Sequence, residues 1–130
     1  MRSPTELTTA FRERGLKITP QRQLLFALLH GNETHPTAEA LHAVASERMP
    51  GISLRTVYQT LNDLAEMGEL QMLDLGTGSS RFDPNIGDHH HLVCDACGAV
   101  RDVHLADART LEPESSESGF VVSSAHIVFL

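Results

Sequence analysis

Paired start and stop signals for helices divide the first 68 residues into regular segments. Ser3 and Thr19 can each cap a helix, and each is followed by a proline, which is tolerated in a first helical turn. Gly15, Gly31 and Gly68 follow three of the segments and are typical helix ends. The predicted helices run from Pro4 to Arg14, from Pro20 to the residue before Gly31, from Thr37 to about Arg48 and from Ser53 to Met67. On the third, Ala38, Leu41, Val44 and Ala45 share an apolar side.

The fourth predicted helix has two contrasting faces. Helical spacing gathers Val57, Leu61, Leu64 and Ala65 into an apolar stripe, and it gathers Arg55, Tyr58, Gln59 and Asn62 on the opposite side. Most polar helix faces are simply solvated. This one, however, carries arginine, glutamine and asparagine, which hydrogen-bond base edges in the major groove, and a tyrosine that can reach a phosphate or a thymine methyl group.

The segment after this helix has the pattern of a two-stranded hairpin. Two strand-like runs, ELQMLDL and SRFD, flank the glycine-containing turn GTGS. Helices followed by a hairpin form a winged helix-turn-helix, in which the segment from Ser53 to Met67 is the recognition helix.

The net charge of −7 conceals an uneven distribution. Up to Phe82 the chain has 8 Lys and Arg against 9 Asp and Glu, whereas beyond Phe82 it has 2 against 8. The first 22 residues are locally basic, so only this end of the chain is suited to a phosphate backbone. No apolar run is long enough to span a bilayer and no signal peptide is recognisable, so we expect a cytoplasmic protein.

The second half of the chain predicts a small separate domain. The segment 83–88 contains Pro84 and Gly87 and is expected to be a hinge. Beyond it, HHLVC, AVRDVHL and GFVVSSAHIVFL have strand character, and ADARTLEPESSES predicts at most a short helix and a polar loop. Three strands this short leave an apolar face uncovered, so we expect that face to be buried in a dimer.

Histidines and carboxylates of this half form a candidate metal site. His89 and His91 alternate along a predicted strand and therefore project from one face, with His90 opposite. Such a pair alone is as consistent with a polar surface as with a metal. With Asp83 at the hinge and Asp102 on the next strand, the set suits Fe(II), Mn(II) or Zn(II) better than Cu(I).

The segment DHHHLVCDACG also contains Cys94 and Cys97, which are the only two cysteines of the chain. Two cysteines three positions apart are a poor disulfide framework, and in a reducing compartment the spacing indicates metal or redox chemistry. A structural zinc site normally takes four ligands, so this pair could supply only half of one.

Five segments, in their order and spacing, make the sequence similar to the ferric uptake regulator family of bacterial metal-dependent repressors. They are GLKITPQR, THPTAEAL, ISLRTVYQTLNDLAEMG, RFDPN and HHHLVCDACG. The resemblance covers nearly the whole chain. It implies an α+β chain with a winged-helix DNA-binding domain at 1–82, a hinge at 83–88 and a small α/β dimerisation and metal-binding domain at 89–130.

The resemblance also implies functional residues. It assigns His35, a position that spacing alone does not reveal, to a regulatory Fe(II) or Mn(II) site whose ligands are His35, Asp83, His89, His91 and Asp102. The DNA-binding residues expected from the resemblance and from the helix face are Lys17, Arg22, Arg55, Thr56, Tyr58, Gln59 and Asn62. A second metal site using His90 or His126, with His104 as a further candidate, matches the family pattern incompletely. For His126, a plain strand histidine is an equally good interpretation.

In most relatives a second CxxC follows the last strand and completes a Zn(II) site with the first. We therefore expect this sequence to be shortened at its C-terminus. The alternative is a true absence of the second pair, which leaves Cys94 and Cys97 as free thiols, a disulfide or an incomplete site.

The predicted function is a metal-dependent repressor that binds a pseudo-palindromic DNA operator as a homodimer. The aspartate at position 83 most resembles the peroxide regulator branch, in which metal-catalysed histidine oxidation releases DNA. An iron-responsive regulator without peroxide sensing is the alternative. A small metalloenzyme is a rival from another class, but no separate general base or nucleophile motif is evident.

Overall fold

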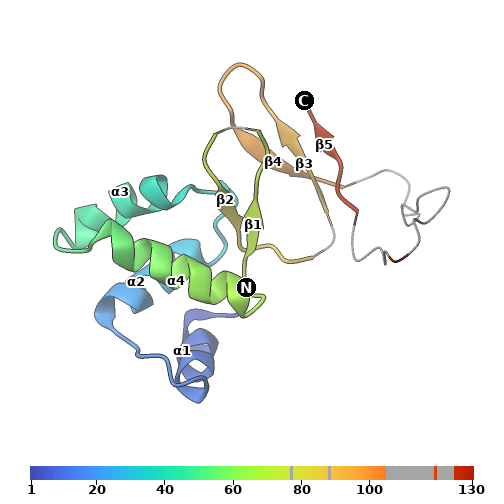
Figure 1. The fold of residues 1–130 in the computed structure, drawn as a ribbon. Coiled ribbons are helices and arrows are strands. Elements are labelled where there is room, and N and C mark those ends of the chain that lie inside the picture. The colour runs from blue at the N-terminus through green and yellow to red at the C-terminus, as the bar shows by residue number, and fades with distance from the viewer. Residues whose placement is uncertain (77, 88, 105–118, 120–124) are drawn as a thin grey trace. The chain divides into compact units, whose positions relative to one another are not determined.

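The computed structural model describes residues 1–76, 78–87, 89–104, 119 and 125–130. The chain divides into two compact units, Met1–Gly87 and Asp88–Leu130, each of which is described by itself (Figure 1). The predicted short helix and polar loop of ADARTLEPESSES lie outside the described residues, as does most of the first half of the predicted third strand.

Four helices form the first unit, and the predicted start and stop signals are confirmed. They are α1 (Pro4–Glu13), α2 (Pro20–Leu29), α3 (Ala38–Arg48) and α4 (Leu54–Glu66). The side chains of Ser3, Thr19, Thr37 and Ser53 each cap the helix that follows. At the end of α4, Gly68 is left-handed with φ 76°, so its amide bonds the Ala65 carbonyl and the next amide bonds that of Leu64.

The apolar faces of these helices enclose one core. Phe11 and Phe26 meet edge to face with ring centroids 4.9 Å apart, and the α4 stripe of Val57, Leu61 and Leu64 is fully buried against them and their neighbours. Val44, which helical spacing places beside Leu41 and Ala45, is 47% exposed, whereas those two side chains are buried. The buried stripe of α3 is narrower than its apolar content suggests.

A hairpin completes the first unit. β1 (Gln71–Leu73) and β2 (Arg81–Asp83) are antiparallel, with Met72 opposite Phe82. Phe82 is 2% exposed and joins the helical core, so the hairpin is packed onto the helices. This element order is that of the predicted winged helix-turn-helix.

The second unit contains a three-stranded sheet in the order β4-β3-β5. β3 (His90–Val93) pairs antiparallel with β4 (Val100–Val103) and parallel with β5 (Val128–Phe129). The α+β class and the three strands are therefore confirmed.

None of the helices in the described part of the chain has the length and apolar composition needed to cross a bilayer.

Candidate metal centre and nucleic-acid interface

The first unit holds a buried histidine–carboxylate pair. His35 lies in the loop before α3 and Asp83 ends β2; His35 Nε2 is 3.2 Å from Asp83 Oδ2, and both side chains are at most 2% exposed. The other oxygen of Asp83, Oδ1, accepts a hydrogen bond of 2.9 Å from the Asn85 amide. That bond orients the carboxylate toward His35, as partners of metal ligands commonly do.

The second unit holds two imidazoles beside one carboxylate. His89 and His91 flank the first residue of β3, their rings lie 4.7 Å apart, and both face Asp102 on β4. Asp102 Oδ1 is 3.2 Å from His89 Nε2 and 3.5 Å from His91 Nε2. His91 pairs with Asp102 in the strand register, so the sheet itself brings these two residues together. The alternation predicted for His89 and His91 is what creates this cluster.

His90 and His126, predicted as a weak second site, lie next to each other in the second unit. Their rings stack 5.9 Å apart, and His90 Nδ1 already accepts a hydrogen bond of 2.8 Å from the Ile127 amide. His126 Nε2 lies 2.6 Å from His91 Nδ1, so it turns the opposite nitrogen of His91 toward Asp102. Partial burial, and then the neighbouring imidazoles, lower the pKa of His126. Its neutral ring can thus exchange a hydrogen bond with His91.

These groups fit a borderline divalent metal ion by their donor chemistry. Within each unit the imidazole nitrogens and carboxylate oxygens lie within 4.8 Å of one another. Imidazole nitrogens and carboxylate oxygens that lie this close together can bind a divalent ion in their deprotonated forms. Two imidazoles with one carboxylate, as in the second unit, is a set that binds Fe(II) in many proteins.

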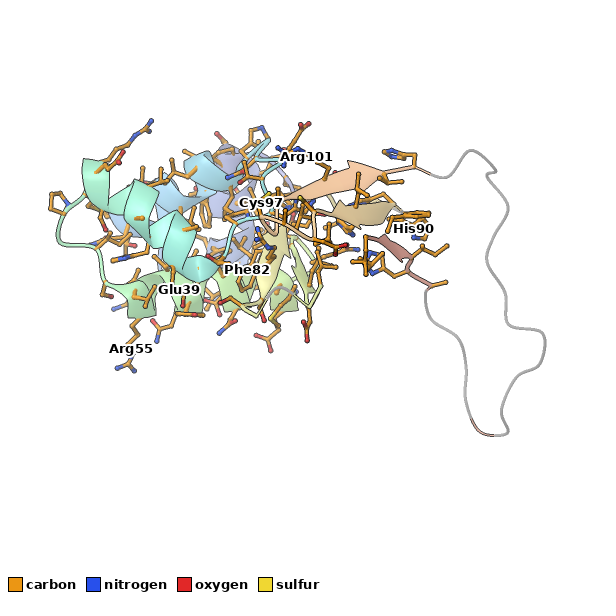
Figure 2. All side chains as sticks on the ribbon, turned by 90° about the horizontal axis from the view of Figure 1, so that it is seen from above. Glu39, Arg55, Phe82, His90, Cys97 and Arg101 are labelled. Atoms are coloured by element: carbon orange, nitrogen blue, oxygen red, sulfur yellow. The ribbon has the colours of Figure 1, made fainter. Side chains whose placement is uncertain are left out.

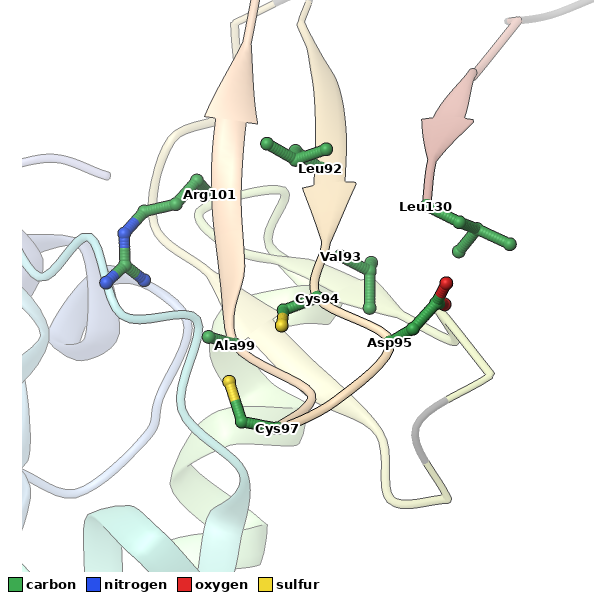
Figure 3. A pocket seen from close by; sticks show the side chains of 8 residues that line it. All are labelled: Leu92, Val93, Cys94, Asp95, Cys97, Ala99, Arg101 and Leu130. Atoms are coloured by element: carbon green, nitrogen blue, oxygen red, sulfur yellow. The ribbon is translucent and has the colours of Figure 1, made fainter.

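The two cysteines lie in the turn that joins β3 to β4. Both thiols are exposed and free, and Figure 3 shows them at this turn. They line a hollow of about 540 Å³. The Cys94 amide donates to the Ala99 carbonyl, and the Gly98 amide donates to the Cys94 carbonyl. Hydrogen bonds from the backbone amides of Cys97 and Ala96 hold the pKa of the Cys94 thiol below its ordinary value. A lowered pKa favours the thiolate, which is the form that binds metal.

The exposed face of α4 carries the predicted base-reading side chains. Arg55, Tyr58, Gln59 and Asn62 are all exposed, and Figure 2 shows Arg55 extending away from the rest of its unit. The Tyr58 hydroxyl donates a hydrogen bond to the carboxylate of Glu39 on α3. That bond lowers the pKa of Glu39 and raises the pKa of Tyr58. This partner was not predictable from the sequence, because Glu39 lies 19 positions away on another helix.

The remaining predicted DNA-binding residues differ in their surroundings. Lys17 is exposed between α1 and α2. Thr56 accepts a hydrogen bond of 2.9 Å from the Ser53 hydroxyl and so belongs to the cap of α4. Arg22 is only 15% exposed and makes an ion pair of 2.9 Å with Asp63 of α4. In this structure Arg22 therefore stabilises α4 through its ion pair with Asp63.

Comparisons with known proteins relate this chain to one family of regulators. A protein-family model described as the ferric uptake regulator family matches residues 13–130. The peroxide-responsive repressor PerR of Staphylococcus epidermidis is 37% identical over 107 residues, covering 82% of this chain and 71% of that protein. A solved zinc-bound manganese uptake regulator has a TM-score of 0.70 and 29% identity, covering 81% of this chain and 78% of that chain. The Helicobacter pylori ferric uptake regulator shares the fold, with a TM-score of 0.72 and 18% identity over 96% of this chain and 86% of that chain.

Proposed function

The chain belongs to the ferric uptake regulator family, and we propose that it represses transcription when one Fe(II) or Mn(II) ion joins its two histidine–carboxylate groups. It is a metal-dependent regulator of transcription and not an enzyme. Because its target is chromosomal DNA, we place it in the cytoplasm.

The observation that supports this proposal is that each unit holds a group of histidine and carboxylate donors. His35 and Asp83 provide two donors in the first unit; His89, His91 and Asp102 provide three in the second. Neither group alone supplies the four or more protein donors of a closed site. If one ion is bound by both groups, metal occupancy is thermodynamically linked to the arrangement of the two units. The segment 83–88 is the proposed hinge.

The DNA-binding part of the proposal rests on α4. A homodimer presents two copies of this helix to the major groove of a pseudo-palindromic operator, where Arg55, Tyr58, Gln59 and Asn62 contact base edges and backbone. Lys17, exposed at the basic end of the chain, contributes contacts to phosphate that are independent of sequence. The acidic remainder of the chain makes binding depend on a few basic contacts, so it should be salt-sensitive.

We propose further that peroxide is the signal, as the name of the Staphylococcus relative states for that protein. Fe(II) held by these residues would activate hydrogen peroxide beside its own ligands. A ring carbon of His35 or of His89 would accept the oxygen: that imidazole would gain one oxygen atom and lose two electrons, and hydrogen peroxide would be reduced to water. An aspartate at position 83 is one methylene shorter than a glutamate and would leave a bound metal ion more accessible to peroxide than a glutamate would. Cys94 and Cys97 hold Zn(II) together with a second cysteine pair where one is present.

Fluorescence anisotropy with a duplex obtained by in-vitro selection in Mn(II) tests the proposal. Mn(II) and Fe(II) should each tighten DNA binding, and a chelator should reverse the effect. Peroxide should abolish binding only in the Fe(II) form and add the mass of one oxygen atom to the peptide carrying His35 or His89. Equal responses of the two forms, or oxidation confined to the cysteines, would replace peroxide sensing by iron-responsive or thiol-based regulation. A DNA affinity that is the same with and without metal would contradict the proposed repressor mechanism.

A further inference from the structure

His35 has an unusual backbone. Its φ is 53°, which makes it the single residue other than glycine with a positive φ in the described part of the chain. Left-handed backbone is sparsely populated by residues with a side chain, and the proline that follows, Pro36, restricts His35 further. Such a conformation persists only where the surroundings hold it, and it is found at sites of function.

Three consecutive residues of β2 hold this loop. Arg81 Nη1 donates a hydrogen bond of 3.1 Å to the His35 carbonyl, and the Phe82 amide donates one of 2.9 Å to the Pro36 carbonyl. Asp83 meets the His35 imidazole. Arg81 and Asp83 project from the same face of the strand. Arg81 therefore bonds the backbone of His35 while Asp83 faces its ring. The side chain of Phe82 anchors the strand in the core.

From these contacts we infer that Arg81 is a positioning residue for the regulatory metal. By bonding the His35 carbonyl it keeps that residue left-handed, and the left-handed backbone directs Nε2 toward Asp83. The inference rests on the proposed function, because it assumes that His35 and Asp83 are ligands. It adds a residue of the hairpin that binds no metal itself yet determines how strongly the metal binds.

Electrostatics alone predicts the opposite sign. A guanidinium near a cation site repels the ion, so removing its charge should tighten metal binding. If Arg81 acts by positioning, its removal should weaken binding, by about 10- to 100-fold as for other partners that orient metal ligands. The direction of the change therefore separates the two effects.

The experiment measures the Mn(II) dissociation constant of the full chain by electron paramagnetic resonance. Arg81→Met removes the donors but keeps an apolar stem, Arg81→Lys restores one flexible donor and the charge, and Arg48→Ala is the control at an exposed arginine of the same unit. We expect about 10- to 100-fold weaker binding for Arg81→Met, partial recovery for Arg81→Lys and no change for Arg48→Ala. Metal-free unfolding of each variant is recorded in parallel.

A wild-type or tighter Mn(II) affinity in Arg81→Met overturns the inference, even if metal-free stability falls, because a purely structural role leaves the folded site intact. Should Arg81→Met fail to fold, Arg81→Lys decides: weakened binding supports positioning and wild-type binding refutes it. The variant His35→Ala distinguishes a failure of the proposed ligand set from a failure of the inference about Arg81. If it leaves Mn(II) binding unchanged, the proposed ligand set is wrong; if it weakens binding while the Arg81 variants do not, only this inference fails.

Discussion

Arg22 offers a sharp test, because its charge suggests a DNA contact while its surroundings indicate a support for α4. Arg22 makes an ion pair with Asp63, donates a hydrogen bond of 3.0 Å to the Lys17 carbonyl and lies 5.2 Å from the centroid of the Phe11 ring. Replacing Arg22 by alanine removes all three contacts. Replacing Asp63 by alanine removes only the ion pair.

The magnitude follows from the burial of the pair, whose side chains are 15% and 24% exposed. Exposed pairs contribute about 0–1 kcal/mol and breaking a buried pair costs about 3–5 kcal/mol, so this one should contribute about 1–2 kcal/mol. The cation–π contact adds about 0.5–1 kcal/mol and the hydrogen bond about 1 kcal/mol. Arg22→Ala should therefore lower the free energy of unfolding by about 2–4 kcal/mol, and Asp63→Ala by about 1–2 kcal/mol.

Urea unfolding of the metal-free protein, followed by far-UV circular dichroism, measures these changes, since the described helices all lie in the first unit. The double variant should show a coupling of about 1 kcal/mol or more between Arg22 and Asp63. DNA affinity of Arg22→Ala should then fall no further than that of Asp63→Ala. If Arg22→Ala keeps wild-type stability but weakens DNA binding and reduces the salt dependence by about one unit of slope, Arg22 is a phosphate contact and the reasoning is refuted.

Three further predictions concern exposed groups. Arg55→Ala should weaken operator binding by about 1–3 kcal/mol and leave the metal content unchanged, as anisotropy and metal analysis can show; a loss of metal would contradict the separation of the two sites. Tyr58→Phe should raise the pKa of Glu39 toward its ordinary value, because the hydroxyl that stabilises the carboxylate is lost; an NMR titration with an unmoved Glu39 signal would refute the hydrogen bond. Cys94 should react with iodoacetamide at a lower pH in the folded protein than in urea-unfolded protein, because backbone amides lower the pKa of Cys94, and equal profiles by peptide mapping would speak against that effect.

Much of the fold was predictable because its signals are local. Capping residues and glycine stops act on backbone groups within one helical turn, so they predicted the ends of the four helices to within about two residues. The alternation of His89 and His91 likewise needs only the geometry of a strand. Val44 shows the limit, because helical periodicity places it beside the apolar stripe but only the packing of neighbouring helices decides its 47% exposure.

The rest depends on contacts between distant segments. His35 lies in a loop with a positive φ, where no periodicity exists, so only resemblance to a family identified it. Arg81 and His126 act through a carbonyl and an imidazole that are 46 and 35 positions away. Arg22 is basic whether it meets a phosphate or Asp63, and sequence alone cannot choose between these partners. The parallel pairing of β5 with β3 also arises only in the folded chain.

The central claim, that one metal ion is shared by both units, is tested most directly by Mn(II) titrations of wild-type protein, His35→Ala, His91→Ala and the double variant. If His35 and His91 bind the same ion, each single variant should weaken Mn(II) binding by at least about tenfold, and the two losses should not be additive. Each single variant should lose the same tight Mn(II)-binding event that the wild-type protein shows. If His35→Ala retains full Mn(II) affinity while His91→Ala loses it, the second unit binds the metal alone and the account is contradicted.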